Sequence, residues 1–294
     1  MFIFASNIYT MKTIRDFNEL RDRLKTCGCK VRVAAVEGTD DHSQEAIQKA
    51  THEGWAEVAN IHLESIEQSA REAVRMVRNG EADVIMKGII NSDILLRAII
   101  NKEEGILPKG NILSHVSVMQ IPTYHKLLFM SDAAVIPYPT LEQRRAIIGY
   151  TKEVCCVYGI SQPRIALIHC NEKVSEKFPL TIDYAQLRKE DFSPAIVDGP
   201  MDVKCAVNRE AALLKHIDSP IDGDADVLIM PDIEAANVYY KTLTSFTDTR
   251  LAVGLVGAAC PVSLTSRGDS ADTKYNSLAM ACLTIIKNLE VRSK

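Results

Sequence analysis

The chain alternates short β-branched runs with segments of helical periodicity, and this alternation limits its fold more than any other feature. The run "KVRVAAVEG" precedes the helical pattern "DDHSQEAIQKATHEG", and the helical pattern "SIEQSAREAVRMVRNG" precedes the run "ADVIMKG". Apolar residues spaced three and four apart predict helices, whereas short continuous apolar runs predict buried strands. We therefore expect an α/β fold in which helices cover both faces of a mostly parallel sheet.

The second half of the chain continues the alternation. "NILSHVSVMQIP" and "KLLFMSDAAVIPYP" are predicted as two strands at a sheet edge, before a long helix with a capping box at Thr140 and Gln143. A second series then follows, in the order "RIALIHC", "AIVDGP", "DVLIMPD", "EAANVYYKTLTSF", "LAVGLVG" and "PVSLTS", of which only the fourth segment is helical. A last helix is expected from about Ser270. Because 294 residues exceed the usual size of one domain, we expect two domains, divided near the Pro-rich "IPYPT".

Composition argues against several classes of protein. The formal net charge of −4, without a basic stripe, gives no footprint for nucleic acid. No apolar run approaches the ~18 residues of a membrane span. The first ten residues, "MFIFASNIYT", lack the basic region and cleavage site of a secretion signal. We expect a cytoplasmic protein, in which Met11 is the true start or the first ten residues form a dispensable arm.

The cysteine pattern predicts reduced thiols rather than a metal site. The eight cysteines comprise Cys27 and Cys29 in "CGC", the adjacent Cys155 and Cys156, and four single residues. No CxxC pair, HxH or HExxH motif is present, so zinc has no predicted ligand set. We expect no metal.

Four loops after predicted strands combine turn-forming and polar residues: "MKGIINSD", "VDGPMD", "MPDIEAANVYYK" and "TSRGDSAD". Ligands of such sheets bind beyond the carboxyl ends of the strands, and a helix that begins there favours anions. Gly88 and Gly268 would allow a ligand close to the backbone, and Arg97 and Arg267 could grip phosphate or carboxylate. Each feature alone also fits an ordinary turn or a solvated arginine. Together they predict an anion-binding cleft.

Standard nucleophile and nucleotide motifs are missing. The sequence contains no GxSxG elbow, no GxGxxG after the first strand and no Walker A lysine. His115 lies on a predicted strand, where a packed histidine is the default. A chain of this kind would align two substrates so that one attacks the other.

The ordered blocks "MKG…NSDILLRAII", "FMSDAAVIPYPTLEQ", "VDGP", "SPIDGDADVLIMPDIEAANVYYK" and "PVSLTSRGDS" resemble the phosphate acetyl/butyryltransferases, and the butyryl branch more than the acetyl branch. The resemblance runs from about Val31 to the C-terminus. The acetyl enzymes commonly carry an Asp, proposed as the base, seven residues after the serine of "SRG". Thr273 occupies that position here, so the base is left open between Asp269 and Asp272, or is not needed.

The resemblance implies two three-layer α/β/α domains similar to those of isocitrate and isopropylmalate dehydrogenases, with the active site in the interdomain cleft. Residues 1–137 with 266–294 would form the first domain, and residues 138–265 an inserted second domain. The implied reaction moves a short-chain acyl group, butyryl first, reversibly between coenzyme A and inorganic phosphate. It implies no cofactor beyond these substrates, no covalent enzyme intermediate, and a homodimer or higher homo-oligomer.

The resemblance also implies roles for particular residues. Arg267 would hold phosphate or the developing oxyanion, Ser266 would hydrogen-bond the leaving sulfur, and Asp272 or Asp269 would act as a base. Arg97 matches a second arginine of the family and would bind phosphate or coenzyme A. The remaining candidates for phosphate or coenzyme A binding are Gly88, Ser92, Gly268, Ser270, Asn237 and Lys241.

Three alternatives stay open. The first is phosphate acetyltransferase, and the second is a non-catalytic acyl-CoA-binding protein that has lost its base, as Thr273 would suggest. The third is an NAD-dependent dehydrogenase of the same fold, which needs metal-binding carboxylates or histidines. Asp224, Asp226 and Asp232 are the residues that could be mistaken for such a set.

Overall fold

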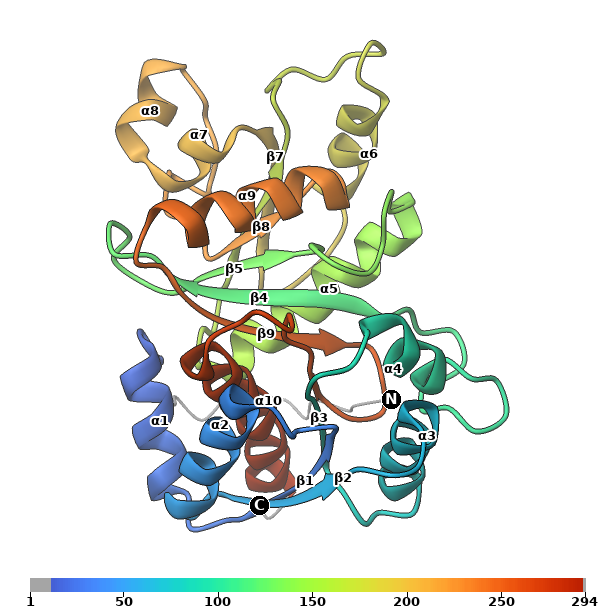
Figure 1. The fold of residues 1–294 in the computed structure, drawn as a ribbon. Helices are drawn as coiled ribbons and strands as arrows, with labels where there is room; N and C mark the ends of the chain where they lie inside the picture. Colours follow the sequence, from blue (N-terminus) through green and yellow to red (C-terminus); the bar gives the residue numbers. More distant parts are fainter. Residues whose placement is uncertain (1–11, 293–294) are drawn as a thin grey trace.

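A single ten-stranded sheet runs through the computed structural model, which describes residues 12–292 (Figure 1). In sheet order the strands are β2 (Ala56–Ile61), β1 (Val31–Val36), β3 (Val84–Lys87), β10 (Val262–Ser263), β9 (Arg250–Val256), β4 (Ser114–Gln120), β5 (Leu128–Ser131), β8 (Val227–Ile229), β6 (Arg164–Ile168) and β7 (Ile196–Met201). The pairs β10–β9, β9–β4 and β4–β5 are antiparallel, and the other pairs are parallel. The prediction of a mostly parallel α/β sheet is confirmed.

Helices cover both faces of the sheet. They are α1 (Phe17–Thr26), α2 (Asp41–His52), α3 (Ile66–Arg78), α4 (Ser92–Ile99), α5 (Leu141–Val157), α6 (Pro179–Leu187), α7 (Val203–Val207), α8 (Arg209–Leu214), α9 (Ile233–Phe246) and α10 (Ala271–Arg292). The predicted capping box of α5 is present: the Thr140 side chain accepts from the Gln143 amide, and the Gln143 side chain accepts from the Thr140 amide. This pairing fixes where α5 begins.

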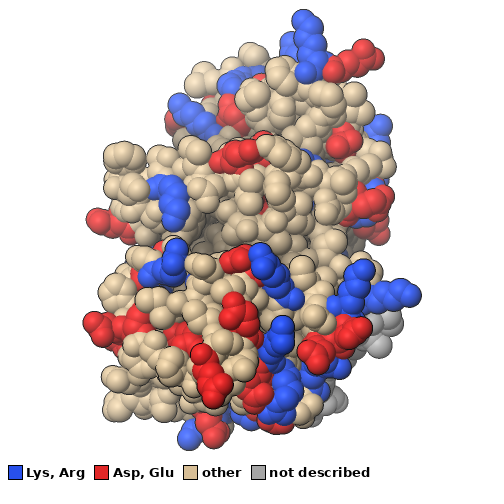
Figure 2. All heavy atoms as spheres, turned by 45° about the vertical axis from the view of Figure 1, so that its right-hand side comes forward, with Lys and Arg blue, Asp and Glu red and all other residues tan. Residues whose placement is uncertain are grey.

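The hydrophobic core differs between the two faces of the sheet. On one face a continuous cluster joins residues of α1, α2, α5 and α10. Its members include Phe17 of α1, Tyr184 of α6 and Leu283 of α10. On the other face the core is divided into one cluster at α3 and α4 and another at α7 to α9. Figure 2 shows the molecular surface hollowed at mid-height, with charged side chains of both signs around the hollow. The divided face therefore leaves room for a site between the two parts of the sheet.

Several predicted elements differ from those observed. β4 and β5 were expected at a sheet edge, which is wrong, because β9 pairs with β4 over seven residues and places both strands inside the sheet. The pairing joins segments far apart in sequence, and the local pattern of residues 111–139 gives no sign of it. β2 and the helices α6, α7 and α8 were not predicted. The hypotheses on Met11 and the first ten residues fall outside the described residues, and the division into residues 1–137 with 266–294 and residues 138–265 stays a prediction.

The carboxyl ends of β1 and β3 approach each other closely at Gly88. The Gly88 amide donates to the Val36 carbonyl at 2.8 Å, and the Ile89 amide donates to the Glu37 carbonyl at 2.9 Å. A Cβ atom at Gly88 would lie 2.0 Å from the Glu37 oxygen, a distance that no side chain tolerates. Gly88 is therefore required for packing before any ligand is considered.

Gly88→Ala is expected to lower the free energy of unfolding by about 1–3 kcal/mol, because the backbone of β1 must move to admit the methyl group. The matched control is Gly149→Ala in α5, where no atom lies within 4 Å of the added Cβ. This control should gain up to about 1 kcal/mol, since alanine favours a helix interior. Urea unfolding of both variants measures the difference. Equal stability of the two variants would show that the β1–β3 contact yields without cost.

Candidate active site

Three loops meet at the carboxyl ends of the neighbouring strands β1, β3 and β10. Gly88 contacts the loop after β1 through the hydrogen bonds described above. The Lys87 ammonium donates to the Thr265 carbonyl at 3.0 Å, which ties the end of β3 to the chain after β10. The loop 266–270 then leads into α10. The sheet thus gathers the "MKG" and "TSRGDS" blocks at one place, as their positions after strands predicted.

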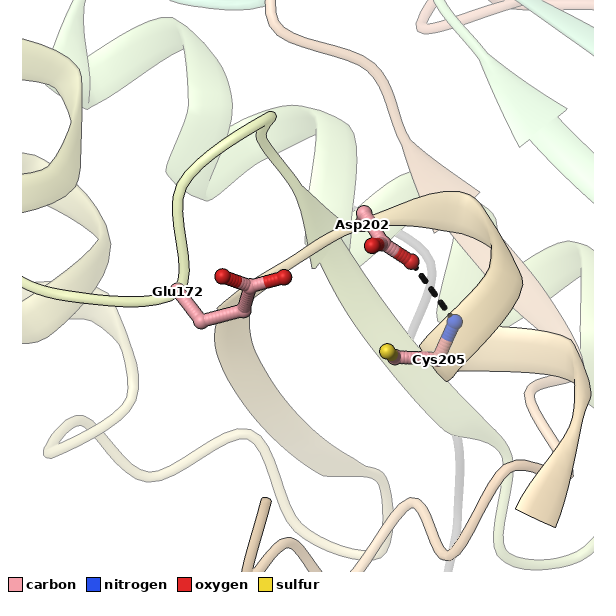
Figure 3. Close-up of side chains that lie close together, drawn as sticks. All are labelled: Glu172, Asp202 and Cys205. Atoms are coloured by element: carbon pink, nitrogen blue, oxygen red, sulfur yellow. Dashed lines mark hydrogen bonds between the residues drawn. The ribbon is translucent and has the colours of Figure 1, made fainter. Parts of the chain in front are cut away.

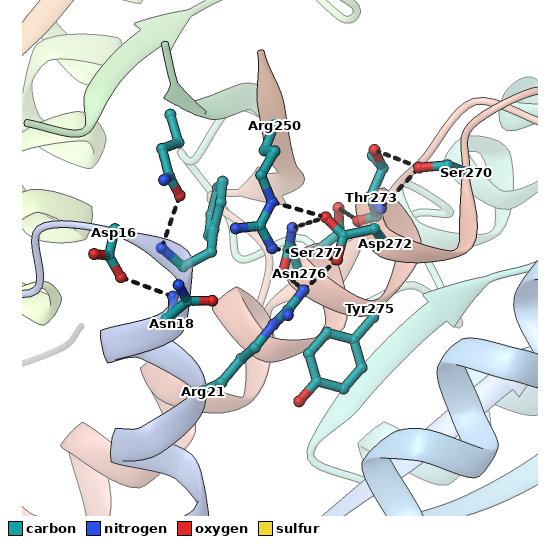
Figure 4. Close-up of polar contacts among 12 residues, drawn as sticks. Asp16, Asn18, Arg21, Arg250, Ser270, Asp272, Thr273, Tyr275, Asn276 and Ser277 are labelled. Carbon is teal, nitrogen blue, oxygen red and sulfur yellow. Dashed lines mark hydrogen bonds and ion pairs between the residues drawn. The ribbon is translucent and has the colours of Figure 1, made fainter. Parts of the chain in front are cut away.

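The loop 266–270 is folded around Asp269. The Ser266 amide donates to Asp269 Oδ2 at 2.8 Å, and the Asp269 amide donates to the Ser266 carbonyl at 3.2 Å. Ser266, Arg267 and Gly268 are left exposed. The Ser270 Oγ accepts from the Thr273 amide at 3.2 Å and so caps the first turn of α10 (Figure 4). The arrangement presents a serine, an arginine and a glycine at a helix N-terminus, where anions are favoured.

Asp272, the other candidate base, is occupied by ion pairs (Figure 4). Its carboxylate accepts from Arg250 Nε at 3.1 Å and from Asn276 Nδ2 at 3.1 Å, and it also pairs with Arg21. Burial opposes its ionisation, but the hydrogen bonds from Arg250 and Arg21 outweigh this, so the pKa of Asp272 lies below its usual value. A carboxylate held in this way joins α1, β9 and α10 and is a weak base.

Two buried lysines beneath the loop were missed by the sequence analysis. Lys87 is 1% exposed, and its ammonium contacts the carbonyls of Thr265 at 3.0 Å and Gly88 at 3.4 Å. Burial, together with the nearby charges of Lys274 and Arg267, lowers the pKa of Lys87 to about 8. Lys274 is fully buried and pairs with Asp40 at 3.0 Å. The only sign of Lys87 in the sequence is its place at the end of the apolar run "ADVIMKG". A lysine in that place is an ordinary strand end.

His115 lies on β4 and is 5% exposed, so it is packed as the sequence analysis expected. Burial lowers its pKa, although the carboxylates of Asp132 and Asp269 oppose this effect. The Asp132 carboxylate is fully used, because Ser114 Oγ and the amides of His115 and Val135 are among its donors. His115 Nδ1 is buried without a hydrogen-bond partner among residues 12–292. A neutral histidine therefore borders the site from the centre of the sheet.

Tyr240 of α9 reaches toward the loop from the other part of the sheet. Burial raises the pKa of Tyr240, and the nearby Asp269 carboxylate raises it further. The Lys241 ammonium lies 4.6 Å from the centre of the Tyr240 ring. Asn237 and Lys241 are both exposed on α9, so these two predicted coenzyme A contacts stay accessible.

Arg97 and Ser92 lie in a different setting. Arg97 is exposed, pairs with Asp93 at 3.2 Å, and lines a groove of about 610 Å³ between α3 and α4. Three more arginines and three glutamates line the same groove: Arg71, Arg75, Arg78, Glu67, Glu72 and Glu104. Ser92 is the first residue of α4, and no interaction found in the described part of the chain joins it or Arg97 to the loop 266–270. The structure thus groups most candidates at β10 and leaves these two on α4.

One group of three potential metal ligands is found among the described residues: Glu172, Asp202 and Cys205 (Figure 3). The Lys215 ammonium lies 2.5 Å from a carboxylate oxygen of both Glu172 and Asp202, so the two acids share one cation of the protein. Burial, with the adjacent Asp202, raises the pKa of the Cys205 thiol to about 11, which disfavours the thiolate that a metal needs. The group is an ion-paired cluster in this structure.

The three aspartates that could be mistaken for the metal ligands of a dehydrogenase, Asp224, Asp226 and Asp232, are also engaged. Asp224 pairs with Lys126 and Arg164 at 3.0 Å each. Asp226 pairs with Lys126 at 2.7 Å, and Asp232 caps α9 by accepting from the Ala235 amide. These partners give each carboxylate a structural role and form no shared ligand set.

Comparison with known proteins gives a consistent result. Residues 10–282 match the family model described as "Phosphate acetyl/butaryl transferase". The chain is 36% identical over 297 residues to a phosphate butyryltransferase of Clostridium acetobutylicum, which covers 92% of this chain and 98% of the relative. It is 36% identical over 282 residues to a phosphate acetyltransferase of Thermotoga maritima, covering 87% and 95%. The crystal structure of a branched-chain phosphotransacylase from Enterococcus faecalis matches with a TM-score of 0.80 and 30% identity, covering 87% of this chain and 99% of that one.

Asp272→Asn is expected to lower stability by about 1 kcal/mol at neutral pH, because Arg21 and Arg250 lose a partly exposed counter-charge. The folded-state pKa of Asp272 lies below its unfolded value, so this contribution is present above about pH 4 and disappears as the pH falls through the folded-state pKa. Thermal unfolding of parent and variant across this pH range tests both statements. A variant with parental stability but no turnover would instead place Asp272 in the chemistry.

Proposed function

The chain belongs to the phosphate acetyl/butaryl transferase family, and on that premise we propose that it moves a short-chain acyl group reversibly between coenzyme A and inorganic phosphate. Butyryl is the acyl group of first choice and acetyl is the alternative, because relatives named for both activities match most of the chain. The observation that carries the proposal is the exposed Ser266–Gly268 segment, which lies at the N-terminus of α10 against Asp269.

The reaction needs positioning and charge stabilisation more than a nucleophile of the enzyme's own. A phosphate oxygen attacks the thioester carbonyl carbon, and negative charge moves to the carbonyl oxygen. The C–S bond then breaks, and coenzyme A leaves as a thiolate while the acyl phosphate forms. Donors fixed before the reaction stabilise these charges without reorganisation. The exposed loop and the start of α10 supply such donors in one place.

Roles follow from this geometry. Arg267 binds phosphate through its forked guanidinium, which suits paired oxygens. The Ser266 hydroxyl donates to the leaving sulfur, while its amide is already used by Asp269. Gly268 has no atom within 4 Å of an added Cβ, so the loop is open for substrate on that side.

We assign any base to Asp269 rather than Asp272. Asp269 lies within the loop beside Ser266, whereas Asp272 is held by Arg21 and Arg250. Thr273, at the position of the expected aspartate, accepts a hydrogen bond from the Ser270 hydroxyl at 3.2 Å and is part of the helix cap. Phosphate is largely dianionic near neutral pH, so the main work of Asp269 is to shape the loop.

Coenzyme A is assigned to two surfaces outside the loop 266–270. The groove between α3 and α4 has four arginines, Arg97 among them, as candidate partners for its phosphates, although three glutamates also line it. Asn237 and Lys241 lie on the exposed side of α9. Ser92 stands at the start of α4, the Gly88 amide ties its loop to β1, and Ser270 caps α10. We propose further that the protein needs no cofactor, works in the cytoplasm, and forms a homodimer or higher homo-oligomer. Within residues 12–292, no helix has the length and apolar character needed to cross a membrane.

The test is phosphate-dependent release of free coenzyme A thiol from acetyl-, propionyl-, butyryl- and isobutyryl-CoA. Release that requires phosphate is the expected result, and the ranking of kcat/KM identifies the acyl group. Saturable thioester binding without release would support the non-catalytic alternative instead.

Arg267→Gln is expected to reduce kcat/KM by on the order of 10²–10³, because one preorganised donor to the developing charge is lost. Ser266→Ala should reduce kcat by a smaller factor. The hydroxyl stabilises only the leaving thiolate, and water can protonate that thiolate once it has left. Arg209→Gln is the matched control, because Arg209 is exposed on α8 and pairs only with Asp222 among the contacts described. A fully active, folded Arg267→Gln protein would refute the assignment of the site.

A further inference from the structure

Among residues 12–292, the buried ammonium group of Lys87 has no carboxylate partner. It is 1% exposed, and the hydrogen bonds that it makes in the described structure go to the carbonyl oxygens of Thr265 and Gly88. Lys274 is equally buried, but it pairs with Asp40 and also donates to Ser43 Oγ at 2.8 Å. An unpaired buried charge is costly, so a chain that keeps one at the edge of a site has a use for it.

The charges around Lys87 leave an excess of positive charge. Arg267 and Lys274 are the nearby cations, and Asp269 and Asp40 are the nearby carboxylates. Asp40 is engaged with Lys274, and Asp269 accepts from the Ser266 amide. Three cations therefore face two carboxylates, and an arriving anion would restore the balance.

The remaining titratable neighbours do not supply that anion. Glu37, on the loop beside Gly88, pairs with His62 and accepts from Ser69 Oγ at 2.5 Å, and it is not among the charges that mainly shift the Lys87 pKa. His42 Nδ1 contacts the Asp269 carbonyl at 3.0 Å, on the outer side of the loop. Tyr240 is kept protonated, because burial and Asp269 raise its pKa.

Lys87 also acts on the shape of the loop. The carbonyl that it holds belongs to Thr265, the residue immediately before Ser266. The Thr265 hydroxyl oxygen is buried and has no hydrogen-bond partner in the described part of the chain. The Lys87 hydrogen bond is therefore the polar contact that fixes this residue to β3.

We propose that Lys87 is a positioning residue for phosphate: it fixes the Thr265 carbonyl, and hence the loop 266–270, and its uncompensated charge draws the phosphate dianion to that loop. The inference rests on the proposed function, because it names the substrate anion that the excess charge receives. Lys87 acts through the loop and through its field, since its ammonium is covered by the protein.

The proposal has a consequence for pH. The Lys87 pKa of about 8 leaves the ammonium mostly charged at pH 7 and mostly neutral above about pH 9. Phosphate becomes more fully dianionic over this range, so its own titration would raise its affinity rather than lower it. Phosphate affinity should therefore fall as the pH rises through about 8, and bound phosphate should move this fall to higher pH, because an anion favours the charged lysine.

The experiment compares Lys87→Met with the parent and with Lys109→Met, which removes one charge from an exposed loop residue. In Lys87→Met, the KM for phosphate is expected to rise about 10-fold or more at pH 7, whereas the KM for acyl-CoA should stay within about twofold. In the parent, kcat/KM for phosphate should fall as the pH rises through about 8, and this alkaline limb of the pH profile should be absent from the variant. The melting temperature should be unchanged or higher, because a desolvated charge has been removed. Lys109→Met should match the parent throughout.

A folded Lys87→Met protein with a parental KM for phosphate, or with the same alkaline limb, would overturn the proposal. If that variant does not fold, calorimetric titration of the parent with inorganic phosphate decides: an affinity that is flat between about pH 7 and 9.5 also overturns it. If the parent binds phosphate but releases no thiol, the proposed reaction is refuted. Loss of phosphate binding in Lys87→Met would still support the inference about Lys87 in that case.

Discussion

The antiparallel pairing of β4 with β9 is the constraint on which the rest of the structure depends. It joins two parallel arrays, β2-β1-β3 and β8-β6-β7, through β10 and β5 into one sheet. The core stays continuous across this junction on one face and is divided on the other. The division keeps α9 and α4 apart, and the ends of β1, β3 and β10 gather their loops beside that opening. Without the junction, Tyr240 would not approach Asp269.

The candidate site combines an exposed loop with a charged interior. Ser266, Arg267 and Gly268 face solvent, while Lys87 and Lys274 lie fully covered beneath them. Buried charge in this position works at low dielectric, where its effect on an approaching anion exceeds that of a surface lysine. In the proposed reaction the surface arginine would select the geometry of the anion, and the interior lysines would set the potential that it meets.

The sequence was informative where local pattern decides the outcome, and it failed where partners are distant. Helical spacing and turn residues were enough to predict the α/β class, the α5 cap and the loops after strands. "TSRGDS" was predicted as an anion site because its residue types carry the chemistry themselves, and that assignment stays a prediction. Lys87 was missed because its burial depends on α10 and on Thr265, which lie far along the chain. The role of Asp272 was open for the same reason, since Arg21 and Arg250 reach it from α1 and β9.

The position of β9 and β10 between β3 and β4 bears on how the protein is made. During synthesis the chain emerges with the N-terminal end first, so β3 and β4 exist long before the strands that must separate them. Until residues 250–292 have emerged, the sheet has two unpaired inner edges, and α10 is absent from the face that it covers. A nascent chain with such edges is a natural client for chaperones. The loop 266–270, the proposed anion site, belongs to this last segment, so a truncated product can neither close its sheet nor complete that site.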